Sequence, residues 1–178
     1  DEEGVAHRIV PEAHRAWHAG ASNWEGEGDV NSRAIGIEIV NGGHDFGLPD
    51  FPDAQIEGLV ALLKDILARN KLDPSRVVGH SDIAPERKLD PGEKFPWKRL
   101  ADAGVAIWPG ECKKPPIGDP VLFAQERLAA FGYGVAASGV VDAQTKAALA
   151  AFQRRFRPAR VDGVADEETL MLLAALSG

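Results

Sequence analysis

The residues with the clearest chemical potential lie in segment 77–92, where a histidine is followed by an aspartate. His80 comes after a β-branched pair and a glycine, and Asp90 lies ten residues later, just before Pro91-Gly92. Zinc accepts imidazole nitrogen and carboxylate oxygen at about 2.0–2.2 Å, and a catalytic zinc keeps one position open for water. The pair therefore indicates a candidate metal site. The alternative to a metal site is purely structural: His80 caps a strand and Asp90 starts a turn, because Asp-Pro-Gly is a common turn sequence.

Two further charged residues could take part in such a site. Lys88 precedes Asp90 by two residues, so in an extended loop their side chains project to the same side. A cation there could stabilise an oxyanion. Glu38 lies between two isoleucines in a predicted strand, and strand alternation places it on the opposite face from them. A carboxylate in the middle of a strand either faces solvent or takes part in chemistry.

The elements around these residues predict an α/β domain over residues 1–110, with a mixed sheet and flanking helices. Extended segments are predicted at 5–10, 34–41, 77–80 and 105–109. An amphipathic helix is predicted from Asp53, as its N-cap, to about residue 71, because its apolar residues recur at helical spacing. A short helix is expected at 98–103.

The rest of the chain predicts a linker and a small three-helix domain. Segment 111–118 is polar and proline-rich, which favours a linker, and 119–178 carries helical patterns. The pattern Gly-Val-x-Asp-x-x-Thr occurs at 139–145 and again at 163–169, which predicts two helices capped by Asp142 and Asp166. Asp119-Pro120 predicts the start of the preceding helix.

Composition narrows the classes of function. The formal net charge is −7, and it divides into −8 for residues 1–112 and +1 for the remainder. This distribution argues against nucleic-acid binding, which needs clustered Lys and Arg. One cysteine, Cys112, excludes an internal disulfide and a cysteine-rich zinc site. No apolar run is long enough for a transmembrane helix, and any signal peptide or lipid anchor is expected outside the given sequence.

Three blocks, at 16–20, 35–41 and 78–92, occur in the order found in one known family. They resemble the zinc-dependent N-acetylmuramoyl-L-alanine amidases of the amidase-2 type, whose fold is related to the peptidoglycan recognition proteins. The tail, through Leu128, Gly132-Tyr133, the repeat and Ala151-Phe152-Gln153, resembles the type 1 peptidoglycan-binding module. A helical spacer without a ligand is the alternative for the tail.

The resemblance implies zinc-dependent hydrolysis of the amide bond between N-acetylmuramic acid and L-alanine, in cell-wall turnover. It implies His80 and Asp90 as zinc ligands, Glu38 as the proton shuttle and Lys88 as the oxyanion stabiliser. Trp17, His18 and Asn41 are candidate contacts to peptidoglycan or muropeptide, and Tyr133, Gln153 and Arg154 are weaker candidates in the tail. It also implies a location in the periplasm or cell envelope.

The sequence departs from that family at one ligand, because the family's first zinc-binding histidine has no counterpart here. A catalytic zinc normally has three protein ligands. We therefore expect the third ligand from an N-terminal segment or a separate N-terminal fragment, and recruitment of His18 is the alternative. The alternative function is a non-catalytic peptidoglycan-binding protein, or an inactive fragment, with an incomplete metal site.

Overall fold

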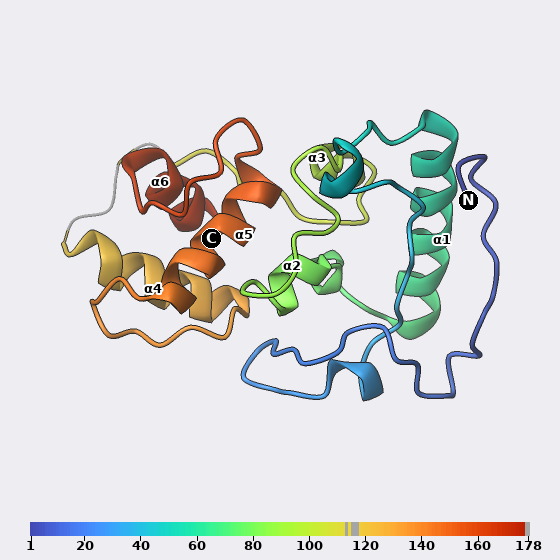
Figure 1. The fold of residues 1–178 in the computed structure, drawn as a ribbon, viewed down its shortest axis with the longest axis horizontal. Coiled ribbons are helices and arrows are strands. Elements are labelled where there is room, and N and C mark those ends of the chain that lie inside the picture. Colours follow the sequence, from blue (N-terminus) through green and yellow to red (C-terminus); the bar gives the residue numbers. More distant parts are fainter. Residues whose placement is uncertain (113, 115–117, 177–178) are drawn as a thin grey trace.

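The computed structural model describes residues 1–112, 114 and 118–176, and their helices gather in two units (Figure 1). The first unit, residues 1–110, has the long helix α1 at its outer side, and the second unit, from residue 119 on, is a cluster of three helices. The described helices are, in chain order, η1 (Val30–Ser32), η2 (His44–Phe46), α1 (Asp53–Asn70), η3 (Pro74–Arg76), α2 (His80–Ile83), α3 (Trp97–Asp102), α4 (Pro120–Phe131), α5 (Ala143–Phe156) and α6 (Glu167–Ala175).

Helix α1 forms because its apolar residues recur along one face, and this face is the buried one. Ile56, Leu59 and Leu63 pack with the aromatic residues Phe95 and Trp97 in the core of the first unit. Pro52, rather than the predicted Asp53, is the N-cap, and Asp53 is the first helical residue. The helix ends at a left-handed residue, Lys71, whose N–H bonds back to the last turn.

The predicted mixed sheet is wrong. Among the described residues no strand forms, and the one isolated bridge joins Trp24 to Glu27. A strand needs a neighbour about 4.7–4.9 Å away that offers its backbone groups. Segments 35–39 and 77–78 instead line a common cavity, and Ala34 and Val40 carbonyls accept side-chain hydrogen bonds. Segments 5–10 and 105–109 are likewise unpaired. The residues have strand-like sequences but lack the partners that would make a sheet.

The second unit follows its capping signals closely. Asp119 accepts hydrogen bonds from the N–H groups of Val121 and Leu122 at the start of α4. Asp142 and Asp166 each accept the N–H of the threonine three residues later, at the starts of α5 and α6. The helices enclose a core that includes Leu128, Leu149, Phe152 and Leu173. Most of the predicted linker, 111–118, lies outside the described residues.

Two buried glutamines form matching hydrogen bonds with the loop between α4 and α5 and with the loop between α5 and α6. Gln125 accepts from the N–H groups of Ser138 and Gly139 and donates to the carbonyl of Val140 and the hydroxyl of Thr145. Gln153 makes the same set of bonds in the other loop, with Asp162, Gly163, Val164 and Thr169. We call each of these arrangements a glutamine clasp. Each clasp satisfies loop backbone groups that would otherwise be buried without a partner.

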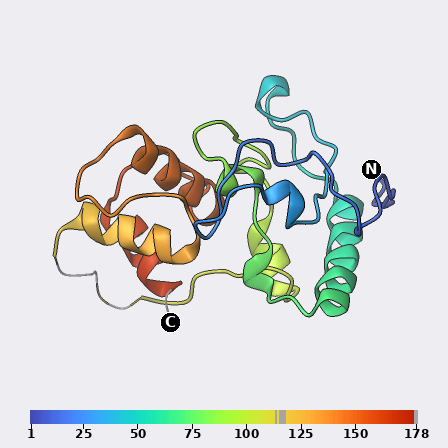
Figure 2. The same cartoon turned by 90° about the horizontal axis from the view of Figure 1, so that it is seen from below.

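The two units pack directly on each other, with α2 of the first unit beside α5 of the second in both views (Figure 1, Figure 2). Trp24 makes edge contacts with Phe131 and Tyr133, and its neighbour Glu25 donates its N–H to the Gly132 carbonyl at 2.8 Å. No described helix is both long and apolar enough to cross a bilayer.

Candidate functional site

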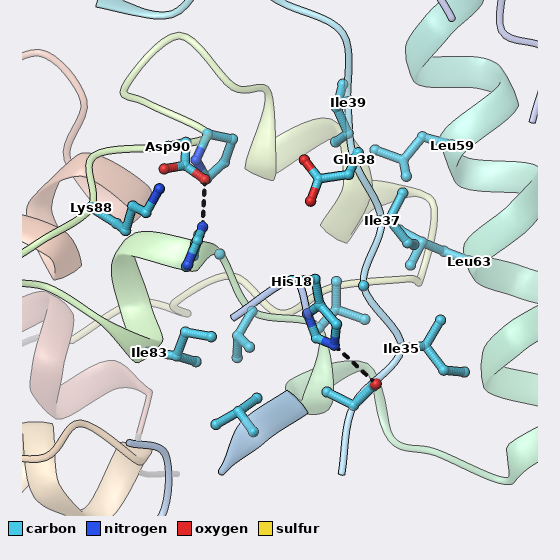
Figure 3. Close-up of a pocket in the computed structure, with 18 of the residues that line it drawn as sticks. His18, Ile35, Ile37, Glu38, Ile39, Leu59, Leu63, Ile83, Lys88 and Asp90 are labelled. Carbon is cyan, nitrogen blue, oxygen red and sulfur yellow. Dashed lines mark hydrogen bonds and ion pairs between the residues drawn. The ribbon is translucent and has the colours of Figure 1, made fainter. Parts of the chain in front are cut away.

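All seven residues that the sequence singles out in the first unit line one cavity. The cavity has a volume of about 1420 Å³ and lies between segment 35–39, α1 and the start of α2. Figure 3 shows Glu38, Lys88 and Asp90 around it, with His18 on its other side. The seven residues are Trp17, His18, Glu38, Asn41, His80, Lys88 and Asp90. Segments far apart in the sequence therefore meet at a common space.

His80 and Asp90 are brought into contact by the backbone around them. His80 does not end a strand, as the sequence predicted, but is the first residue of the short helix α2 after the N-cap Gly79. The N–H of the next residue, Ser81, donates to the Asp90 carbonyl at 2.9 Å. The His80 Nδ1 and Asp90 Oδ2 atoms are 3.0 Å apart.

The other ring nitrogen of His80 faces a group that can only accept. The Nε2 atom lies 3.1 Å from the carbonyl oxygen of Ala19, so it must carry a proton to bond there. In the neutral ring Nδ1 then has a lone pair, and this lone pair faces the Asp90 carboxylate. Such a pair of electron donors is stabilised by a proton or by a metal cation between them.

The charges around Asp90 favour its ionised form. When Nδ1 of His80 carries a proton, its hydrogen bond to Asp90 holds the pKa of the Asp90 carboxyl below its usual value, and the positive charges of His80 and Lys88 act in the same direction, while partial burial opposes them. A metal between the two groups would take the place of that proton, because zinc binds deprotonated ligands.

Glu38 and Lys88 approach the pair from different segments. Figure 3 shows the Glu38 carboxylate pointing across the cavity toward Asp90, while Ile37 points toward Leu63 of α1. The alternation expected of a strand therefore persists in this unpaired segment. Lys88 lies beside Asp90 on the same loop. The geometry places a carboxylate and an ammonium near the candidate ligands.

The three candidate substrate contacts differ in their surroundings. Trp17 is 82% exposed, with the Arg15 guanidinium 4.3 Å from its ring centre. The His18 ring lies against Gly36, where a Cβ would come within 2.4 Å of it, and its Nε2 is 3.3 Å from the Ala34 carbonyl. Of the three, Trp17 is the most open to a ligand.

Asn41 already has partners within its own loop. Its Nδ2 donates to the Pro49 carbonyl at 3.0 Å, and its Oδ1 accepts the Gly43 N–H at 2.9 Å. These bonds shape the loop that borders the cavity.

The residues fit a zinc site in their chemistry but not in their number. Two zinc ligands in tetrahedral geometry lie roughly 3.4 Å apart, close to the observed separation of His80 and Asp90. Within the part of the chain that the structure describes, however, no three His, Cys, Asp or Glu side chains are grouped so that they could hold a metal. Recruitment of His18 as a third ligand is therefore not seen.

Nothing in the sequence indicated the role of one residue near the site, Arg87, and two contacts predicted in the second unit are wrong. The Arg87 guanidinium donates to the carbonyls of Ala19 and Ala21 and so fixes the loop that faces His80. The spacing of Arg87 carries no signal for this role. In the second unit, Tyr133 and Gln153 are buried at 2% and 0% exposure, so they cannot contact a ligand as predicted. Their apolar surroundings and internal hydrogen bonds explain the error.

Comparison with known proteins finds one family match in each part of the chain. Residues 1–93 match the N-acetylmuramoyl-L-alanine amidase family (Amidase_2), and residues 117–173 match a peptidoglycan binding domain (PG_binding_1). The chain is 39% identical to N-acetylmuramoyl-L-alanine amidase AmiD of Escherichia coli over 184 residues, which cover 95% of this chain and 66% of AmiD. It is 43% identical to 1,6-anhydro-N-acetylmuramyl-L-alanine amidase AmpD of Enterobacter cloacae over 98 residues, 55% of this chain and 50% of AmpD.

Solved structures give the same result. AmiD of E. coli, in complex with the substrate anhydro-N-acetylmuramic acid-L-Ala-D-gamma-Glu-L-Lys, superimposes with a TM-score of 0.83, covering 96% of this chain and 71% of that one, at 39% identity. AmpDH3 of Pseudomonas aeruginosa gives a TM-score of 0.83 at 41% identity, with 96% and 72% covered. The chain thus spans between half and two thirds of the curated relatives named above. It belongs to the Amidase_2 family of N-acetylmuramoyl-L-alanine amidases and carries a peptidoglycan-binding type 1 domain behind the amidase domain.

Proposed function

We propose that this protein hydrolyses the amide bond between N-acetylmuramic acid and L-alanine in peptidoglycan or in muropeptides derived from it. The observation that carries the proposal is the convergence of His80, Asp90, Glu38 and Lys88 on one cavity. The family membership supports the same reaction, and the substrate named for the AmiD complex is a muropeptide with this bond.

The proposed cofactor is one zinc ion held by His80 through Nδ1 and by Asp90. Members of this family are zinc-dependent, and when bound the metal would lower the pKa of water and polarise the amide carbonyl. Among the described residues no third ligand is grouped with these two. The expected source of a third ligand is a segment that precedes Asp1, either in the same chain or as a separate fragment.

The side chains of the cavity supply the rest of the chemistry. Glu38 accepts a proton from the attacking water and returns it to the amine that leaves. Lys88 provides positive charge where the carbonyl oxygen becomes negative. Ala19 and Arg87 keep His80 in the tautomer that leaves Nδ1 free to bind the metal. Trp17 offers an exposed aromatic face for a sugar ring or the stem peptide.

The second unit is proposed to hold the enzyme on its polymer, which would place the protein in the periplasm or cell envelope. Its family match supports this role. Because Tyr133 and Gln153 are buried, the contacts with polymer must involve other, exposed residues. The test is sedimentation with purified peptidoglycan sacculi: the protein should pellet with them, and failure to do so would favour a purely structural second unit.

The first experiment measures zinc per chain by elemental analysis on protein purified without added metal, together with the intact mass of the same sample. An amidase should contain close to one zinc per chain. Incubation with anhydro-N-acetylmuramyl-tripeptide should release a tripeptide with a free alanine amine, detected by mass spectrometry, and chelation should stop this release.

The alternative, a peptidoglycan-binding protein without catalysis, is favoured by the absence of a grouped third ligand among the described residues. It predicts no bound zinc and no released peptide while binding to sacculi is retained. That combination would overturn the proposed hydrolysis.

A further inference from the structure

A buried ion pair crosses from the second unit to the segment that carries His80. The Arg155 Nη1 atom of α5 and the Asp82 Oδ2 atom of α2 are 2.9 Å apart, and both side chains are only 1% exposed. The two residues are 73 positions apart in sequence. A charge buried this deeply is tolerated only when it is paired and hydrogen-bonded.

The bonds of this pair lie on both sides of His80. Asp82 accepts the N–H of Gly79, the residue immediately before His80, at 2.8 Å. Arg155 donates its second nitrogen to the Val77 carbonyl at 3.0 Å. One guanidinium group of the second unit therefore fixes the backbone at Val77 directly and at Gly79 through Asp82.

Aromatic residues hold the guanidinium group and its carboxylate partner in place. The Arg155 guanidinium lies 4.1 Å from the centre of the Trp97 ring, which belongs to the first unit. Tyr133 of the second unit donates its hydroxyl to the other oxygen of Asp82 at 2.5 Å. Trp97 also packs near Gly79, where a Cβ would come within 3.3 Å of the ring.

From this geometry we propose that Arg155 and Tyr133 are positioning residues for the candidate metal pair, so that the second unit holds the zinc-binding loop of the first. Neither side chain forms a hydrogen bond or an ion pair with His80 or Asp90, and both act through Asp82 and the backbone at Val77 and Gly79. The proposal rests on the proposed function, since it assigns these residues to that same site. It gives the second unit a role in metal binding in addition to holding polymer.

A second buried arginine provides a matched control. Arg157 lies two residues further along and is 4% exposed, and it pairs with Asp166 at 2.6 Å and with Asp162 at 3.1 Å. Its ion-pair partners all belong to the second unit. Loss of Arg157 should therefore weaken the fold of the second unit without touching the backbone at His80.

The test compares Arg155→Lys, Tyr133→Phe and Arg157→Lys in the whole protein. Lysine keeps the charge opposite Asp82 but cannot reach both Asp82 and the Val77 carbonyl as the planar fork does. The dissociation constant for zinc, measured by competition with a chelator, should rise by up to about 10-fold in Arg155→Lys. This is at the low end of the effect of losing a group bonded directly to a metal ligand, because Arg155 acts through Asp82 and the backbone. The dissociation constant should rise less in Tyr133→Phe and stay unchanged in Arg157→Lys.

A second readout needs no metal. Amide hydrogen exchange at Gly79 and Ser81, whose N–H groups bond to Asp82 and Asp90, should be faster in Arg155→Lys than in Arg157→Lys. Tyr133→Phe removes one hydroxyl and keeps the ring. If Arg155→Lys does not fold, this variant tests whether the second unit positions the His80 loop.

The outcomes separate this proposal from the proposed function. If the unmodified protein binds no zinc, the proposed function fails, and the exchange rates alone decide whether Arg155 orders the loop. If the unmodified protein binds zinc and Arg155→Lys and Tyr133→Phe bind it equally well, with unchanged exchange at both amides, the positioning role is refuted. Equal weakening by Arg157→Lys would also refute it, because general destabilisation would then explain the effect.

Discussion

The two units of this chain differ in how their structure is specified. In the second unit each helix begins at an aspartate that caps it, and the loops are fastened by buried glutamines. In the first unit α1 is the main regular element, and the residues proposed for chemistry lie on short helices and extended segments. Local signals therefore specify the second unit, whereas contacts between distant segments specify the first.

This difference has a functional consequence at the shared boundary. The irregular segments of the first unit are held partly by the regular unit, through Trp24 against Phe131 and Tyr133 and through Trp108 against Phe156. Loops that carry functional residues need a rigid support. The three-helix unit provides part of that support here, in addition to any binding role of its own.

The largest expected effect tests whether the chemistry is confined to the first unit. Glu38→Gln removes the proposed proton acceptor and should reduce muropeptide hydrolysis by about 10²–10⁴, with zinc content and unfolding midpoint unchanged. Hydrolysis is followed by mass spectrometry of the released peptide. Asp45→Asn is the control, because Asp45 lines the same cavity without an assigned role. Near-normal hydrolysis by Glu38→Gln would show that another group moves the proton.

The next effect tests whether the two units unfold together. Phe152→Ala opens the core of the second unit and should cost about 3–5 kcal/mol of unfolding free energy. All four tryptophans belong to the first unit, and three of them, Trp24, Trp97 and Trp108, contact the second unit. Their fluorescence therefore reports on the first unit and its boundary with the second, while circular dichroism reports on all helices. Both probes should shift to lower urea concentration by the same amount. A shift in circular dichroism with unchanged fluorescence would contradict the mutual support described above.

Smaller effects are expected at the helix caps of the second unit. Asp142→Ala should cost about 1 kcal/mol, the usual value for a lost N-cap, and Asp166→Ala about 2 kcal/mol. Asp166 costs more because it also pairs with the buried Arg157. Urea unfolding of the two variants checks the order. Equal losses would mean that the bonds of Arg157 to Asp162 and Glu168 compensate fully.

The smallest effect is the acid sensitivity of that same cap. Partial burial raises the pKa of Asp166, but hydrogen bonds from Arg157 and Thr169 outweigh it and lower the pKa from 3.8 to about 2. A lowered folded-state pKa stabilises the fold above the unfolded value, and this stability is lost as the pH falls from near 4 through about 2.

The loss should be of the order of 1 kcal/mol, because Asp166 is partly exposed. The difference in unfolding free energy between the unmodified protein and Asp166→Asn should therefore shrink between about pH 5 and pH 2.5. A difference that stays constant over this range would show that the ionised carboxylate makes no net contribution.

The same contrast explains what the sequence could and could not predict. The helices of the second unit were predictable from Asp119-Pro120 and the repeated Asp-x-x-Thr, because a cap involves residues that are adjacent in the chain. The sheet was predicted wrongly because a strand depends on a partner that the segment itself does not specify. Alternation of Ile37, Glu38 and Ile39 indicated the faces of an extended segment but not what would lie beside it.

The residues of the candidate site were predicted from the sequence, but the contacts that hold these residues in place were not. His80, Asp90, Glu38 and Lys88 do line one cavity, but their roles stay predictions. The pair of Asp82 and Arg155 was missed because its members are 73 residues apart. A signal existed: Arg155 follows Phe152 by three residues and so falls on the buried face of α5, where an arginine requires a partner.

The two glutamine clasps make the two loops of the second unit depend on one side chain each. Ser138-Gly139-Val140 and Asp162-Gly163-Val164 occupy equivalent places around Gln125 and Gln153, each followed by an aspartate cap and a threonine. Each amide group bonds both to the loop and to the threonine in the first turn of the following helix. The course of each loop and the start of the helix after it are therefore fixed by the same glutamine, so the three helices are tied together at two matching points.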